Sequence, residues 1–144
     1  MNDRVHVDAN VILRFLRNDD EEQSPRAAAL LQMTQSGSLL LLVSPVTLME
    51  VFYVLSRTYR MERKEAARLL ATLLSSAALV CDDGGVTIDA LARITSNQVS
   101  FGDSFLAATA ARANEPIATF DQGLASFTDV QFFPLDTLPP PKPG

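Results

Sequence analysis

The stretch RVHVDANVILRF, residues 4–15, determines how the first part of the chain folds. Val5 and Val7 alternate with polar residues, a pattern typical of a strand. After Asp8 an apolar run begins, and we expect a helix over residues 9–17. Asp8 therefore lies at the junction of a strand and a helix. The simplest role for an Asp at this place is an N-cap, so any further role must be argued from the rest of the chain.

Length and composition indicate one domain of a globular protein. The chain has 144 residues, of which 47% are hydrophobic, enough to bury a core. No apolar run approaches the roughly 20 residues of a membrane helix, and the N-terminus lacks the apolar region of a signal peptide. The single cysteine, Cys81, excludes an internal disulfide, and we expect it in the core. We expect a reducing, cytoplasmic location.

Charge is distributed unevenly along the chain. The net charge is −5, which is not typical of a nucleic-acid-binding protein. Residues 1–80 carry nine basic and nine acidic side chains, whereas residues 81–144 carry three and eight. One basic cluster stands out in the first half: Arg57, Arg60, Arg63, Lys64 and Arg68. A solvated helix face and an RNA-contacting surface both remain open as interpretations of this cluster.

Strands and helices are expected to alternate along most of the chain. We predict strands over residues 4–8, 39–43, 78–81, 117–119 and 130–135. We predict helices over residues 9–17, 22–35, 45–59, 62–76, 86–97 and 100–113. Such alternation is typical of an α/β fold, here a central parallel sheet of 4–5 strands sandwiched by about 6–7 helices. Residues 1–136 form this domain, and residues 137–144 form a disordered, proline-rich tail.

Two acidic residues are predicted to meet at one edge of this sheet. Asp8 follows the strand at 4–8, and Asp121 follows the strand at 117–119. In parallel sheets, ligands bind beyond the carboxyl ends of the strands. Taken alone, Asp121 is equally compatible with a turn.

Glu50 lies in PVTLMEVFYVL, a helical segment that is apolar on nearly every side, including at Val46 and Val54. Such helices are usually buried, so we expect Glu50 to be buried as well. A buried carboxylate needs a cationic partner. A bound metal ion is our preferred partner, and an ion pair with Arg57 is the alternative.

Asp103 opens the alanine-rich helix FGDSFLAATAAR, where an acid also complements the helix dipole. Together with Asp8, Glu50 and Asp121 it forms a set of oxygen donors without Cys or His. Such a set suits a hard cation, Mg²⁺ or Mn²⁺, which would neutralise the crowded carboxylates. The chemistry expected of it is phosphodiester hydrolysis. Asn10, on the following turn, is placed to orient Asp8 or a water.

Four short motifs carry a resemblance to a known family: VDANVILRFL, SPVTLMEVFYVLSRTY, FGDSFLAATAA and IATFD. In order and spacing, the sequence resembles the PIN-domain ribonucleases of the VapC toxin type. The resemblance implies a metal-dependent endoribonuclease with Asp8, Glu50 and Asp103 as core acids and Asp121 as the fourth. It places Thr119 at the family's hydroxyl position, and it implies homodimers and a cognate antitoxin. Gly102 and Ser104 depart from the alanines that such toxins often carry.

Other functions are weighed against this interpretation. A haloacid-dehalogenase-like phosphatase needs a second Asp where Asn10 stands, and a receiver module needs a late-strand Lys that is missing. A non-catalytic PIN-like scaffold that binds RNA or a partner remains the alternative. We do not expect His6 to act as a base. Arg14 and Arg17 share a helix face with Asn10 and are candidates for RNA backbone contact.

Overall fold

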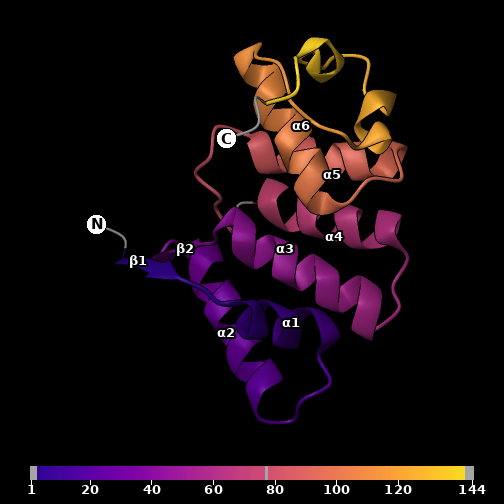
Figure 1. Ribbon diagram of the computed structural model, residues 1–144. Coiled ribbons are helices and arrows are strands. Elements are labelled where there is room, and N and C mark those ends of the chain that lie inside the picture. Colours follow the sequence, from indigo (N-terminus) through magenta and orange to yellow (C-terminus); the bar gives the residue numbers. More distant parts are fainter. Residues whose placement is uncertain (1–2, 77, 142–144) are drawn as a thin grey trace.

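The computed structural model describes residues 3–76 and 78–141 (Figure 1). Its α-helices are α1 (Ala9–Arg17), α2 (Gln23–Gln35), α3 (Pro45–Tyr53), α4 (Arg63–Ser75), α5 (Val86–Ser96) and α6 (Phe101–Ala113). Its strands are β1 (Asp3–His6) and β2 (Leu39–Leu42). A π-helix, η1 (Val54–Thr58), extends α3, and two 3₁₀ helices follow α6, η2 (Gln122–Ser126) and η3 (Leu135–Thr137).

The structure confirms the predicted helices. They were predictable because the signals that begin a helix are local in the sequence. Asp8 caps α1, Ser44 caps α3 with Pro45 in its first turn, and Ser100 caps α6. In each case the side-chain oxygen accepts a hydrogen bond from a backbone N–H of the first turn. These caps begin three of the helices that carry predicted site residues.

The predicted sheet of 4–5 strands is wrong for the described residues, which contain a two-stranded sheet. β1 and β2 pair in parallel, from Asp3 opposite Leu39 to His6 opposite Leu42. The expected strand at 78–81 is reduced to a single bridge between Val80 and Leu42. The order across the sheet is therefore β1, β2 and the segment around Val80.

The two late strands are also absent as regular strands. Ile117 pairs in parallel with Phe132, donating its N–H to the Gln131 carbonyl at 2.8 Å and accepting from the Phe133 N–H at 2.8 Å. The backbone of Ile117 is thus bonded to the C-terminal segment and not to β1. Its side chain packs in a small second core. The members of this core are Val99, Ala107, Ala110, Ile117, Leu124, Phe127 and Val130.

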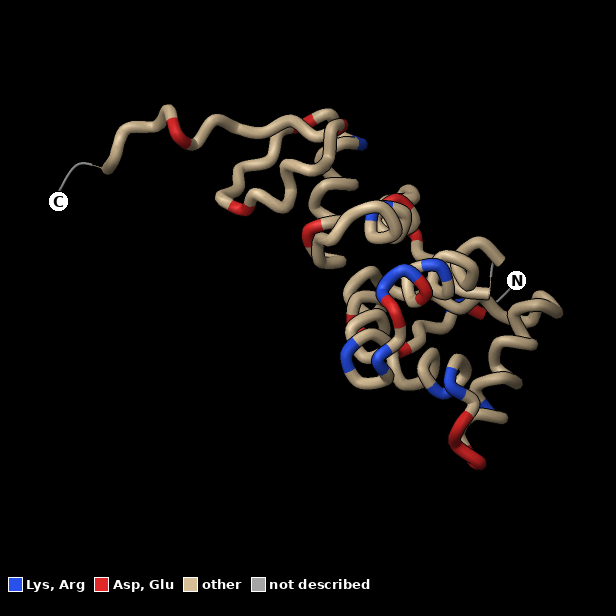
Figure 2. The backbone as a smooth tube through the Cα atoms, turned by 90° about the vertical axis from the view of Figure 1, so that its right-hand side faces the viewer, with Lys and Arg blue, Asp and Glu red and all other residues tan. Residues whose placement is uncertain are grey.

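The helices are stacked in chain order, from α1 and α2 at one end to α6 at the other (Figure 1). The main core runs through this stack, from Ile12 on α1 to Ile94 on α5. In Figure 2 the segment leading to the C-terminus extends away from the helices. The predicted proline-rich tail begins at the last residue of η3, Thr137, and its residues 142–144 lie outside the described part of the chain.

No helix within residues 3–76 and 78–141 is both long enough and apolar enough to cross a bilayer.

Candidate functional site

Asp8 lies between β1 and α1, as predicted, and it is exposed. Its Oδ1 accepts a hydrogen bond from the Val11 N–H at 3.1 Å. The capping role expected of an Asp at this place is therefore present. Capping uses one of its two carboxylate oxygens, and the other has room for a further partner.

A cavity of about 440 Å³ opens beside Asp8, between α1 and α2. Its polar lining includes Asn10, Arg14 and Gln23, and its apolar lining includes Leu30. Arg14 is half-buried and is oriented by a 2.7 Å hydrogen bond from its Nε to Oε1 of Gln23. Asn10 and Arg14 therefore share a helix face with Asp8 nearby, as the sequence predicts.

Arg17 does not line this cavity. Its guanidinium lies over the Tyr59 ring, 4.1 Å from the centroid, and its Nε is 3.9 Å from Oδ2 of Asp19. Arg17 is thus bound to neighbours within the fold.

Glu50 is exposed, so the prediction that it is buried is wrong. The physical reason is a stripe along α3 that the core does not cover. Val46 is 73% exposed and Tyr53 is 60% exposed, and these residues lie one turn before and one turn after Glu50. The alternative ion pair is not formed among the described residues, since Arg57 lies over the Tyr53 ring, 5.6 Å from its centroid.

Asp103 lies in the first turn of α6 and is half-buried. Its backbone N–H donates to Oγ of the N-cap, Ser100, at 3.0 Å. Phe101, two residues earlier on the helix, packs edge-on against Phe52 of α3, with the ring centroids 5.4 Å apart. This contact brings the start of α6 against the helix that carries Glu50.

Asp121 is exposed and caps η2, accepting from the Gly123 N–H at 2.8 Å. Thr119 Oγ1 accepts from the Asp121 N–H at 2.9 Å, so Thr119 orients the backbone at Asp121. Ile117 pairs with Phe132, and among the described residues no strand pairing joins this segment to β1. The expected common sheet edge for Asp8 and Asp121 is therefore not formed.

The donor chemistry of the four acids suits a divalent cation, but their arrangement does not. Within residues 3–76 and 78–141, no group of three or more Asp, Glu, His or Cys side chains is placed to hold a metal ion. The residues consequently form no metal centre in this arrangement, and their assignment as metal ligands stays a prediction.

A second cavity, which the sequence analysis did not identify, lies between α3, η1 and the starts of α4 and α6. It measures about 450 Å³ and contains Tyr53, Arg57 and Arg63 in its lining. Tyr53 follows Glu50 by three residues, and this spacing was the available signal, since such residues share a helix face.

Cys81 and His6 have no place among these groups. Cys81 is half-buried against the core, and burial raises the pKa of its thiol. His6 lies exposed on β1. Neither observation assigns a catalytic role to these side chains.

Comparison with known families identifies the class of protein. The sequence matches the PIN domain family over residues 5–130, a span that contains Asp8, Glu50, Asp103 and Asp121. No curated protein shows a significant match. The chain therefore belongs to the PIN domain family. PIN domains are generally nucleases and generally use divalent metal ions.

Proposed function

We propose that the protein is an endoribonuclease that hydrolyses RNA phosphodiester bonds in the presence of Mg²⁺ or Mn²⁺. The observation that carries this proposal is the family match over residues 5–130, which includes all four predicted acids in their expected sequence contexts. A scaffold that binds RNA without cleaving it has no need for four such acids.

Particular residues have particular roles in this proposal. Asp8, Glu50, Asp103 and Asp121 would hold a divalent cation once gathered, and that cation would supply charge neutralisation at the phosphate. Arg14, held by Gln23 in the cavity beside Asp8, contacts the RNA backbone, and Asn10 orients Asp8. Among the described residues these acids are not gathered into one site.

The biological role that we propose is that of the toxin in a toxin–antitoxin pair, acting as a homodimer. An antitoxin tail of this kind would be an amphipathic helix. The cavity between α1 and α2 has a mixed surface that suits such a helix, with Val11, Ala27 and Leu30 beside Arg14. The support here is the sequence resemblance together with this surface.

The test is cleavage of single-stranded RNA by the purified protein with Mn²⁺, with Mg²⁺ and with EDTA. We expect cleavage with either metal and none with EDTA. The control is a variant with Asp8, Glu50, Asp103 and Asp121 all changed to Ala, measured alongside the wild type to exclude a contaminating nuclease. RNA binding by the wild type without cleavage under any of these conditions would favour the non-catalytic scaffold.

A further inference from the structure

The cavity between α3, η1, α4 and α6 has an apolar interior and a basic rim. Phe52 and Phe101 are buried at its inner wall and contact each other edge-on. Tyr53 and Arg57 lie exposed at the rim. With a volume of about 450 Å³, the cavity falls in the range of about 300–1,000 Å³ that is usual for small-ligand pockets.

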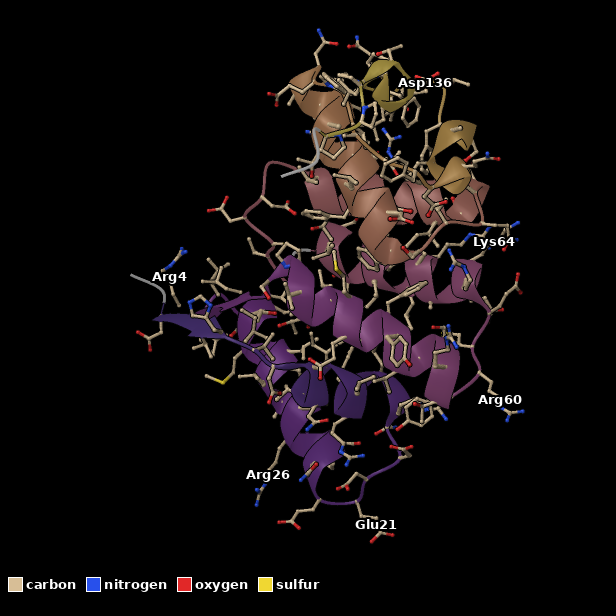
Figure 3. All side chains as sticks on the ribbon, in the orientation of Figure 1. Arg4, Glu21, Arg26, Arg60, Lys64 and Asp136 are labelled. Carbon is tan, nitrogen blue, oxygen red and sulfur yellow. The ribbon has the colours of Figure 1, made fainter. Side chains whose placement is uncertain are left out.

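Charge distinguishes this cavity from the rest of the molecule. Its lining includes Arg57 and Arg63 and contains no acidic residue, although the chain as a whole carries a net charge of −5. In the sequence, two further basic residues and the acids Glu62 and Glu65 lie close to Arg57 and Arg63. Arg60 and Lys64 point outward on one side of the molecule, whereas Arg4 lies on the opposite side (Figure 3). The ligand that complements this cavity is therefore an anion.

The two arginines have different tasks. Arg63 is half-buried, donates a hydrogen bond to the Val99 carbonyl and lies 5.8 Å from the Phe52 ring centroid, so it helps to hold α4 against the start of α6. Arg57 is exposed and lies over the Tyr53 ring. Arg57 is consequently the group that is free to meet a ligand's phosphate.

The exposed ring of Tyr53 indicates that the ligand also has a flat face. Aromatic rings beside arginines form the stacking surfaces on which proteins bind the bases of single-stranded nucleic acids. The ring is carried by the last residue of α3, where the chain passes into the π-helix η1. Short π-helical segments are rare and frequently occur at functional sites.

The cavity also adjoins two of the predicted acids in sequence. Tyr53 is one helical turn from Glu50 on the exposed stripe of α3, and Gly102 in the lining directly precedes Asp103. A strand of RNA bound here would continue toward both carboxylates.

We infer that this cavity binds one nucleotide of single-stranded RNA, with its base stacked on Tyr53 and its phosphate at Arg57. The inference rests on the proposed function, because it names a substrate-binding site next to the predicted acids. An acidic peptide would match the charge of the rim, but it would not require the exposed aromatic ring.

The test measures binding of a fluorescein-labelled oligouridine by fluorescence anisotropy, in EDTA to prevent cleavage. We expect Tyr53→Ala to weaken binding by roughly tenfold or more. Arg57→Ala should weaken it and should make the slope of log affinity against log salt concentration less steep by about one unit. The matched controls are Phe133→Ala, an exposed aromatic residue outside the cavity, and Arg4→Ala, and both should bind as the wild type does.

A third variant fills the cavity without disturbing its walls. Apart from its chain neighbours and its own helix, a Cβ added to Gly102 would meet only Ser100 Oγ, at 3.9 Å, so we expect Gly102→Leu to fold and to narrow the entrance. We expect oligouridine binding to fall while the melting temperature stays the same or rises. Circular dichroism melts of all variants separate lost binding from lost fold.

Several outcomes would overturn the inference. Unchanged oligouridine affinity in Tyr53→Ala, Arg57→Ala and Gly102→Leu would do so. The same holds if these variants lose binding of a labelled acidic peptide that the wild type binds, while they still bind oligouridine. In either case, metal-dependent cleavage by the wild type would leave the proposed function standing. Conversely, RNA binding that depends on these three residues, without any cleavage, would retain the cavity and reject the nuclease proposal.

Discussion

Arg93 of α5 and Asp129 of the C-terminal segment form a bidentate ion pair. Arg93 Nη1 lies 2.8 Å from Oδ1 of Asp129, and Nη2 lies 2.6 Å from Oδ2. Nε of the same guanidinium donates to Asp89 at 2.9 Å, and the group lies 5.1 Å from the Phe127 ring centroid. Arg93 is thus a polar connection between the helical stack and the segment that follows Asp121.

This connection predicts a stability effect. Arg93→Ala removes hydrogen bonds to two carboxylates from a side chain that is only 11% exposed, so the free energy of unfolding should fall by about 2 kcal/mol. The control is Arg26→Ala, since Arg26 and its partner Glu22 are both 77% exposed and should contribute less than about 0.5 kcal/mol. Urea denaturation measures both variants. Equal losses would show that the Arg93 pair contributes no more than a surface pair.

The same pair predicts a pH dependence. The Arg93 guanidinium holds the pKa of Asp129 below its usual value. In acid the unfolded chain therefore takes up the proton first, and the stabilisation is lost as the pH falls through the lowered folded-state pKa. The stability advantage of the wild type over Asp129→Asn should be constant down to about pH 4 and should shrink below it. Urea denaturation at several pH values tests this, and an advantage that persists undiminished at the lowest pH would contradict it.

The sequence predicts the helices well and the later strands poorly, for a physical reason. A helix start depends on a few neighbouring residues, such as Ser44 followed by Pro45. A strand depends on a partner that can be distant in the sequence, and the strand's own residues do not specify which segment that partner is. Ile117 could have paired beside β1, but it pairs with Phe132, only fifteen residues away, and packs in the second core.

Local sequence signals have the same limit for the predicted site residues. Asp8 and Asp103 lie where their capping contexts place them, at helix starts. The exposure of Glu50 was not predictable from an apolar pattern, because Val46 and Tyr53 are apolar or aromatic and nevertheless exposed. The pattern records which residues are able to be buried, and packing determines which of them are.

Substitutions at Asp8 separate its capping role from its proposed catalytic role. Asn caps a helix about as well as Asp, so Asp8→Asn should fold with unchanged stability and should lose RNA cleavage by about a hundredfold or more. Asp8→Ala should lose cleavage too and about 1 kcal/mol of stability, because the Val11 N–H loses its acceptor. Cleavage and urea denaturation are measured on both variants. Activity retained in Asp8→Asn would restrict Asp8 to capping.

Cation binding is testable without any activity. A cation that binds only the folded protein raises its melting temperature by mass action. We expect Mn²⁺ to raise the melting temperature of the wild type and to have a much smaller effect on Asp8→Ala/Asp103→Ala. Such a result would mean that the ion gathers carboxylates that stand apart in this structure. An equal rise in both proteins would place the ion elsewhere.

Two buried serines provide the last prediction. Ser104 is fully buried next to Asp103, and its Oγ has no hydrogen-bond partner among the described residues. Ser24 is 2% exposed, and its Oγ donates to the Arg14 carbonyl at 2.8 Å and accepts from the Asp20 N–H at 3.2 Å. Ser104→Ala should therefore stabilise the protein by about 1 kcal/mol, since it removes an unpaired buried hydroxyl from a helix.

Ser24→Ala makes the same chemical change at a position where the hydroxyl is paired. It should cost about 1–2 kcal/mol, because the Asp20 N–H loses its acceptor and the Arg14 carbonyl keeps only its hydrogen bond from the Asn18 N–H. Urea denaturation of both variants under one set of conditions gives opposite signs if the two hydroxyls differ as the structure shows. Destabilisation by Ser104→Ala would mean that this hydroxyl has a partner in the folded protein. In that case the start of α6, where Asp103 lies, is packed differently from the arrangement described here.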